Sequence, residues 1–171
     1  MKKIFISAFS LIGLLAAGQN VIQIRPQANY VQIPNNSAFH FTTTVTYEAK
    51  VYVCDDSSSF VNEQVIAINC ISPDQWGFFI AIAPGRKARA ACCAGTSTYK
   101  CDAPDAIPND GQFHTITGTR SGNTLKVYVD GVLKNSATVS SVNLRNGYGV
   151  NRIGIAQANV FPSKPYLLKD V

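Results

Sequence analysis

The most basic stretch of the sequence is a short segment that could bind an anion. Arg86, Lys87 and Arg89 follow Pro84-Gly85, which predicts that they lie at the tip of a hairpin. Cations grouped in this way could contact an anionic polysaccharide or an acidic surface. The alternative is a solvated turn, because Lys and Arg commonly protect exposed strand edges.

The single tryptophan, Trp76, is a second candidate for ligand binding, because an indole ring can stack on a sugar. The residues that follow it include Phe78, Phe79 and Ile80, so burial in the core is the alternative. Trp76 and the three cations are therefore the candidate ligand-binding residues.

Acidic and amide side chains are most closely grouped in one stretch, which could bind a cation. Calcium is bound by several carboxylate and carbonyl oxygens, and the stretch 94–111, which we expect to be a loop, supplies the densest set. The candidate ligands are Asp102, Asp105, Asn109 and Asp110. Their spacing fits no fixed calcium-loop motif, so a polar loop without any ion is the alternative.

No group of residues is spaced for catalysis. Glycoside hydrolysis needs two carboxylates that face one sugar, which on a strand means acids two or four residues apart. Glu48 and Glu63 each stand alone, and no nucleophile motif flanks His40 or His114. The sequence therefore predicts a protein that is not an enzyme.

The amino terminus predicts export. A charged start, Met1-Lys2-Lys3, is followed by an apolar run from Ile4 to Ala17 and by a small residue, Gly18. The run is shorter than the roughly 20 residues of a membrane-spanning helix. We therefore expect a signal peptide over residues 1–18 and a secreted or cell-surface protein, with an uncleaved anchor as the alternative.

Export bears on the five cysteines, which are Cys54, Cys70, Cys92, Cys93 and Cys101. In an oxidising compartment such a group predicts a disulfide framework rather than a zinc site, which would need close Cys or His pairs. We expect two disulfides and one unpaired thiol, and the spacing leaves the pairing open. Cys92 and Cys93 should point to opposite faces if their segment is extended.

Length and composition indicate one folded domain. The chain has 171 residues, of which 46% are hydrophobic and 15% charged, and a net charge of +5. Removal of Lys2 and Lys3 with the signal peptide lowers that charge to +3. A surplus so small, without a long basic run, excludes a nucleic-acid footprint.

Apolar and polar residues alternate along much of the chain, which predicts strands. The clearest case is the run 45–53, where Val45, Ala49 and Val51 share one face with Tyr47 and Val53. Further strands are expected over 19–25, 30–33, 76–83, 86–93, 113–119, 125–129, 152–156 and 166–171, and from 132 onward after an Asp130-Gly131 hairpin turn. The pattern predicts an all-β, antiparallel sandwich or barrel.

Several of these segments resemble the laminin G-like and concanavalin A-like family. The residues 110–120 and 125–133 are similar to its central hairpin, 29–34 to its opening strand, and 46–51 to a further strand. The resemblance implies an antiparallel two-sheet jelly-roll sandwich over residues 19–171, of a kind that binds sugars, glycosaminoglycans or proteins, often with calcium. Phe113 and Lys50 stand where the family usually has tryptophan, which weakens any inference of sugar stacking there.

Together these features predict a secreted, non-catalytic recognition module that binds carbohydrate or a surface glycoconjugate in adhesion. The alternatives are an assembly domain that makes protein–protein contacts and an accessory module of a larger polysaccharide-degrading enzyme. The family pattern usually continues beyond Val171. We therefore expect the sheet to lack its final strand and to be completed by a downstream segment or domain or by a partner's strand.

Overall fold

The computed structural model describes residues 22–24, 31–34, 36, 43–53, 63–72, 75–94, 97–140, 150–154 and 166–169. The predicted signal peptide lies outside these residues. The described strands are β1 (Ile22–Ile24), β2 (Val31–Ile33), β3 (Thr44–Val53), β4 (Gln64–Ser72), β5 (Gln75–Ala83), β6 (Lys87–Ala94), β7 (Ser97–Ala106), β8 (His114–Ser121), β9 (Thr124–Val129), β10 (Val132–Thr138), β11 (Val150–Ile153) and β12 (Tyr166–Lys169). One 3-10 turn, Pro84–Arg86, joins β5 to β6.

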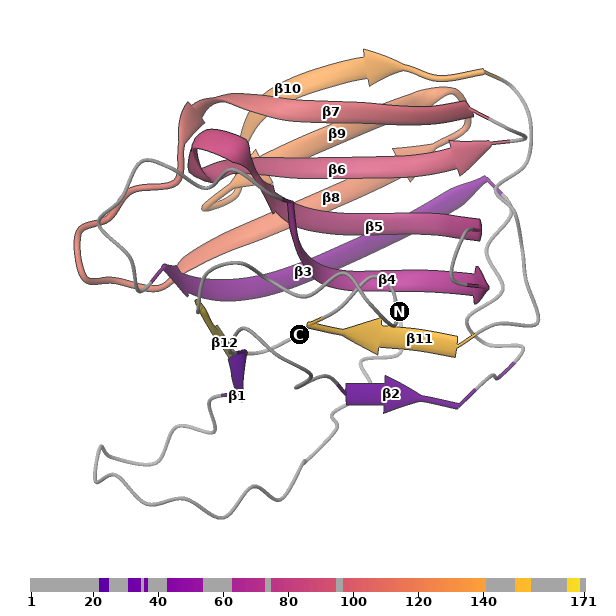
Figure 1. The fold of residues 1–171 in the computed structure, drawn as a ribbon. Coiled ribbons are helices and arrows are strands. Elements are labelled where there is room, and N and C mark those ends of the chain that lie inside the picture. Colours follow the sequence, from indigo (N-terminus) through magenta and orange to yellow (C-terminus); the bar gives the residue numbers. More distant parts are fainter. Residues whose placement is uncertain are drawn as a thin grey trace.

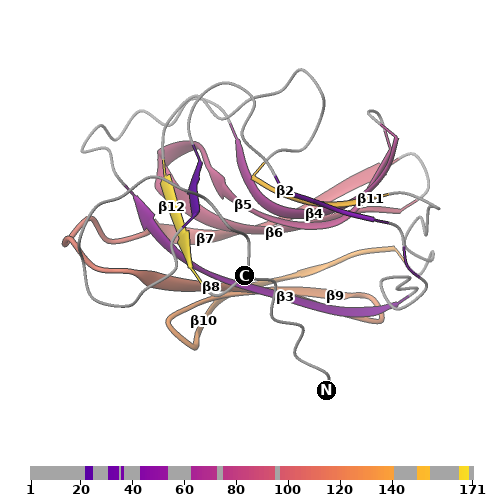
Figure 2. The same ribbon diagram turned by 90° about the horizontal axis from the view of Figure 1, so that it is seen from below.

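The strands form two antiparallel sheets that stack face to face (Figures 1 and 2). The first sheet has the order β1-β12-β3-β8-β9-β10, and the second has the order β2-β11-β4-β5-β6-β7. The second sheet is curved, and its concave side faces away from the first sheet (Figure 2). This concave side is called the outer face below. The predicted all-β, two-sheet antiparallel sandwich is confirmed.

The core lies between the sheets and follows the alternation of the sequence. On β3, Val45, Ala49, Val51 and Val53 are buried, while the residues between them are exposed or half-buried. Tyr47 packs edge-on against Phe78 of β5, with ring centroids 5.3 Å apart, so the two sheets meet through aromatic contact.

The close approach of the two sheets requires a glycine in β8. A Cβ atom added to Gly118 would lie 2.4 Å from Cγ2 of Ile80 and 3.0 Å from Cβ of Ala90. Because both of these atoms are attached to buried strands of the second sheet, neither can swing away freely.

The two hairpin turns predicted after β8 and β9 are present. Gly122 has a φ of 56°, and Asp130 and Gly131 have φ values of 51° and 76°. At Asp130-Gly131 both central residues have positive φ, which is the backbone of a type I′ turn, whereas in the β8–β9 turn only the first central residue, Gly122, does.

Two strands of the second sheet differ from the prediction. The stretch predicted as a loop contains β7, and β4 was not predicted at all. In β4 the pairing with β5 shifts between Val65 and Ala67, which is a bulge that interrupts the alternation. β7 is rich in Asp, Lys and Pro, residues that strands usually avoid, and it is extended because it pairs with β6 along Arg89 to Ala94.

The last described strand, β12, is paired on both sides. Its residues pair with β1 through Ile22 to Ile24 and with β3 through Lys50 to Val53. β12 therefore fills the position between β1 and β3. A further strand beyond Val171 stays a prediction.

The predicted disulfides are not found among the described thiols, since Cys92, Cys93 and Cys101 are free. Cys101 pairs with Ala90 and Cys92 with Tyr99, so the two buried cysteines are diagonal neighbours, about 7 Å apart. That separation is too large for a disulfide, whose Cβ atoms lie about 3.5–4.5 Å apart. Cys54 and the side chain of Cys70 lie outside the described part of the structure.

Cys92 and Cys93 point to opposite faces, as predicted. Cys92 belongs to the core, while Cys93 is half-buried and lies 3.3 Å from Oγ1 of Thr98. Burial raises the pKa of the Cys92 thiol to about 11, although the guanidinium of Arg120 opposes the rise. The thiol is therefore protonated and unreactive at neutral pH.

Within the part of the chain that the structure describes, no helix has the length and hydropathy of a membrane span.

Replacement of Gly118 by alanine should destabilise the fold by about 1–3 kcal/mol, because the added methyl group overpacks the interface between the sheets. Chemical denaturation of the purified domain measures this change. Thr119→Ala is the matched control, because it alters the next residue of β8, which faces away from the core. An alanine at 118 that leaves the midpoint unchanged would show that the sheets are not closely packed there.

Candidate functional site

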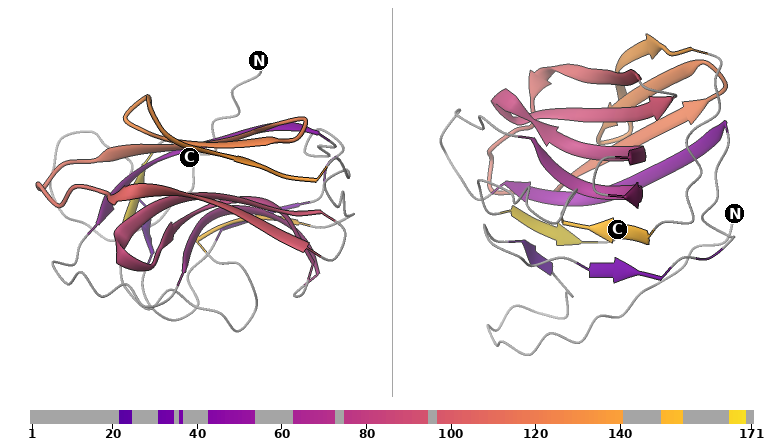
Figure 3. Two further views of the ribbon diagram at one scale, coloured as in Figure 1. Left: turned by 90° about the horizontal axis from the view of Figure 1, so that it is seen from above. Right: turned by 45° about the vertical axis from the view of Figure 1, so that its right-hand side comes forward.

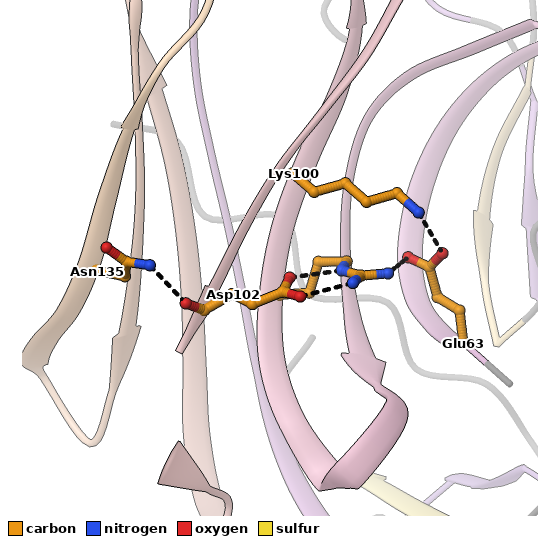
Figure 4. Close-up of polar contacts among 5 residues, drawn as sticks. Glu63, Lys100, Asp102 and Asn135 are labelled. Atoms are coloured by element: carbon orange, nitrogen blue, oxygen red, sulfur yellow. Dashed lines mark hydrogen bonds and ion pairs between the residues drawn. The ribbon is translucent and has the colours of Figure 1, made fainter. Parts of the chain in front are cut away.

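A cluster of four charged residues lies on the outer face of the second sheet. Arg89 of β6 is flanked by Ala88 and Ala90, which belong to the core, so its own side chain points outward. Asp102 of β7 pairs directly with it across the ladder. Glu63, just before β4, and Lys100 of β7 complete what we call the Arg89 cluster (Figure 4).

The guanidinium of Arg89 holds both carboxylates. Its Nε donates to Oδ1 of Asp102 and its Nη2 to Oδ2, each at 2.6 Å, which is a bidentate pair. Its Nη1 lies 3.3 Å from Oε1 of Glu63. One arginine therefore links the segment before β4 to β6 and β7, the edge strand of the second sheet.

Exposure differs sharply between members of the cluster. The side chain of Arg89 is 10% exposed and that of Glu63 is 18% exposed. The side chain of Asp102 is 34% exposed and that of Lys100 is 47% exposed. The centre of the cluster is thus structural, while Asp102 and Lys100 on β7 are accessible to a ligand.

Burial by itself lowers the pKa of the Arg89 guanidinium. The hydrogen bonds with Asp102 and the negative charges of Glu63 and Asp102 more than offset that effect, so the pKa is raised. Arg89 is therefore a permanent cation, and its charge is matched locally.

The cluster is also tied to the first sheet. Nδ2 of Asn135, on β10, donates to the backbone carbonyl of Asp102 at 2.7 Å (Figure 4). β7 and β10 are the edge strands of their sheets, and they run close together on the same side of the sandwich (Figures 1 and 3). The backbone that carries Asp102 is therefore fixed from both sheets.

Beside the cluster, the outer face of the second sheet is apolar. Val65, Ile68, Phe79, Ala81 and Ala91 form a second buried cluster, separate from the main core. β5 is accordingly buried on both faces, as its apolar sequence predicted.

The structure separates the three cations predicted as a basic patch. Arg89 lies apart from the turn on β6, and the carboxylates of Glu63 and Asp102 contact its guanidinium. Arg86 and Lys87 lie at the turn between β5 and β6, and both are half-buried. The Nε atom of Arg86 is buried. The backbone carbonyl of Arg86 accepts a hydrogen bond from the N–H of Ile107 at 2.8 Å, and this contact stabilises the turn. The side chain of Trp76 lies outside the described part of the structure.

The residues predicted to bind calcium do not converge. Asp102 is bonded to Arg89 of β6, whereas Asp110 is bonded to His114, four residues further along the chain. Asp105 and Asn109 are exposed. In the described residues no group of three or more His, Cys, Asp and Glu side chains is placed to hold a metal ion. The physical reason is that Asp102 and Asp105 belong to the strand β7, which points them to opposite faces, while Asn109 and Asp110 follow after the strand has ended.

Sequence reasoning missed Glu63 and Lys100 and assigned Arg89 and Asp102 to different sites. An Arg and an Asp 13 residues apart form such a pair only if the two strands meet in one register, here Arg89 opposite Asp102. Glu63 was isolated in sequence because β4, which follows it, was not recognised.

A second polar cluster surrounds His114 at the start of β8. Its Nδ1 lies 2.8 Å from Oδ2 of Asp130, and its Nε2 lies 3.0 Å from Oδ1 of Asp110. Oδ1 of Asp130 accepts from the N–H of Thr115 at 2.8 Å. The imidazole thus ties the hairpin turn to the segment before β8, and both of its nitrogens are engaged within the protein.

The three side chains shift one another's titration. Burial lowers the pKa of His114, but hydrogen bonds to Asp130 and Asp110 more than offset this, so the pKa is raised. The hydrogen bond to His114 lowers the pKa of Asp110. Burial raises the pKa of Asp130, but its hydrogen bonds with His114 and with the Thr115 N–H more than offset this, so the pKa is lowered.

The chain belongs to the concanavalin A-like lectin and glucanase superfamily. A family model of the laminin G type, described as "Concanavalin A-like lectin/glucanases superfamily", matches residues 25–167. The resemblance expected from the sequence is thereby confirmed. A search of curated proteins found no match.

Solved structures confirm the fold. The receptor binding domain of botulinum neurotoxin D is similar with a TM-score of 0.64 and 12% identity, over 88% of this chain and 39% of that chain. The receptor binding domain of the mosaic serotype C/D toxin gives a TM-score of 0.64 and 16% identity, over 88% and 37%. This chain spans well under half of those chains, and at such identities the likeness shows the fold alone. Glucanases share the fold of this superfamily, so the fold does not decide between binding and hydrolysis.

Replacement of Arg89 by methionine should destabilise the domain by about 1–3 kcal/mol, because two carboxylates are left without their cation. The loss is modest because solvent screens the charge of Asp102, whose side chain is 34% exposed. Urea denaturation measures the loss. Lys87→Ala, two residues away on the same strand, should change stability by less than about 0.5 kcal/mol. Equal effects of the two changes would contradict the central place of Arg89.

The His114 cluster should make stability depend on pH. Because the folded pKa of His114 is raised, its contribution is fully present below the unfolded value of about 6.5 and is lost as pH rises through the folded pKa. Because the folded pKa values of Asp110 and Asp130 are lowered, their contribution to stability is present above the unfolded value of about 3.9. That contribution is lost as pH falls through the folded pKa values.

The free energy of unfolding should therefore fall in the native protein as pH rises above about 6.5, and this fall should be absent in His114→Gln. Denaturation at a series of pH values measures it. The control is His40→Gln, which removes the other histidine. A native profile that matches that of His114→Gln would refute the pairing.

Proposed function

We propose that this protein is an exported, non-catalytic recognition module that binds carbohydrate at the Arg89 cluster. The observation that carries the proposal is a pair of accessible polar groups on one face of β7, Lys100 and Asp102, of which Asp102 is held in place by Arg89. Membership of a superfamily that contains lectins supports the same assignment. Export rests on the predicted signal peptide.

The chemistry of the cluster suits a sugar. A carboxylate accepts hydrogen bonds from hydroxyl groups, and an ammonium group donates to hydroxyl or ring oxygens. Lys100 and Asp102 are two residues apart and on the same face, so they lie about 7 Å apart along the strand. Together they can contact neighbouring parts of one or two sugar rings.

The carboxylate of Asp102 is also pre-organised. Asp102 is fixed by two hydrogen bonds from Arg89, and its backbone is fixed by Asn135. A ligand therefore pays little of the entropy that ordering a free carboxylate would cost. Thr98, also exposed and two residues before Lys100, extends the same polar row toward the other end of β7.

A specific observation favours an assembly role as the second candidate. Val132 and Leu133 are 59% and 48% exposed at the start of β10, an edge strand of the first sheet. Exposed apolar residues on an edge strand favour pairing with another chain. Sedimentation of the native protein and of Leu133→Ser distinguishes this role, since only an assembly domain would lose self-association in the variant.

Lys100→Ala should weaken the binding of an oligosaccharide about threefold to tenfold, through loss of one charged hydrogen bond. A glycan array identifies the oligosaccharide, and calorimetry measures its affinity. Lys126→Ala is the matched control, because Lys126 lies on β9 of the other sheet. Equal binding by Lys100→Ala and the native protein would place the ligand elsewhere.

A further inference from the structure

The charge balance of the Arg89 cluster bears on what kind of sugar it can bind. The cluster holds two cations, Arg89 and Lys100, and two carboxylates, Glu63 and Asp102. It is therefore neutral as a whole. A neutral cluster does not concentrate anions from solution, which is what a binding site for sulfated polysaccharide must do.

The arginine is also closed to an outside anion. Sulfate and carboxylate groups are best bound by the planar fork of a guanidinium, through two parallel hydrogen bonds. In Arg89 that fork, Nε and Nη2, is occupied by the two oxygens of Asp102, and Nη1 faces Glu63. An anionic ligand would have to displace an internal carboxylate and leave it beside the ligand's own charge.

The groups that remain accessible are of opposite sign and lie on one strand. Asp102 and Lys100 are 34% and 47% exposed, and they share the outer face of β7. A neutral hydroxylated ligand can donate to the first and accept from the second without any repulsion. A sulfated ligand would be attracted by the charge of Lys100 and repelled by that of Asp102.

We infer that the Arg89 cluster selects neutral glycans and rejects sulfated or uronate-rich ones, and that Asp102 is the residue that sets this selectivity. The inference rests on the proposed function, and it reverses the expectation that Arg86, Lys87 and Arg89 bind an anionic polysaccharide. Its physical basis is that the carboxylate of Asp102 already occupies the position on the Arg89 guanidinium that an anionic group of a ligand would take.

The inference predicts a gain of function. Asp102→Asn leaves the cluster with an excess positive charge and replaces the carboxylate on the guanidinium fork with a weaker partner. This variant should acquire binding to sulfated oligosaccharides. Such binding should weaken as salt rises from low to high concentration, since the attraction is between charges.

The test uses one array that carries neutral oligosaccharides of glucose, galactose, mannose and N-acetylglucosamine beside heparin octasaccharides. The native protein should bind a neutral oligosaccharide with less than about a twofold change in affinity between low and high salt, and it should not bind heparin. Asp102→Asn should lose about tenfold or more for the neutral ligand and gain salt-sensitive heparin binding.

Each contrary result has a distinct meaning. Salt-sensitive heparin binding by the native protein, lost in Lys87→Ala, would overturn the selectivity while the proposed function stood. Binding to neither class of glycan would overturn the proposed function and the selectivity with it. If Asp102→Asn does not fold, the native protein on the same array still decides the selectivity, and a loss of neutral binding in Lys100→Ala assigns it to the Arg89 cluster.

Discussion

The guanidinium of Arg89 is the contact on which the outer edge of the second sheet depends. Among the described strands, β7 is an edge strand that pairs with β6 alone, and its sequence is poorly suited to a strand. The bidentate pair between Arg89 and Asp102 joins these two strands by a charged contact, and Glu63 brings in the segment before β4. A guanidinium with so little exposure would destabilise the fold if it had no partner. The two carboxylates and Arg89 therefore depend on one another.

The same contact determines which groups a ligand can meet. Because Arg89 is occupied, the accessible face of the cluster consists of Asp102 and Lys100, a mixed pair and not a basic patch. The His114 cluster is different in kind, since its two imidazole nitrogens are bonded to Asp130 in the β9–β10 turn and to Asp110 before β8. The hairpin that most resembles the family therefore has a structural role at its turn, while the proposed site lies on the opposite sheet, whose strands were harder to predict.

Most of the fold could be predicted from local patterns, because strands such as β3 alternate strictly and turns such as Asp130-Gly131 have a characteristic composition. The two strands that were missed owe their structure to pairing. β4 contains a bulge, and β7 is extended only because β6 lies beside it. The site depends on the register between β6 and β7, and register is a property of the pair that neither strand carries in its own sequence. The cysteines were misjudged for the same reason, since Cys92 and Cys101 share a face but are diagonal neighbours.

A crystal structure of the domain with its preferred neutral oligosaccharide tests most directly whether the ligand binds on the outer face of β7. The account predicts sugar hydroxyl groups within hydrogen-bond distance of the Asp102 carboxylate and of Nζ of Lys100, with the bidentate pair between Arg89 and Asp102 intact. A sugar bound on the first sheet, on the side of β3, β8 and β9 that faces away from the core, would contradict this prediction. So would a sugar whose own anionic group replaces Asp102 on Arg89.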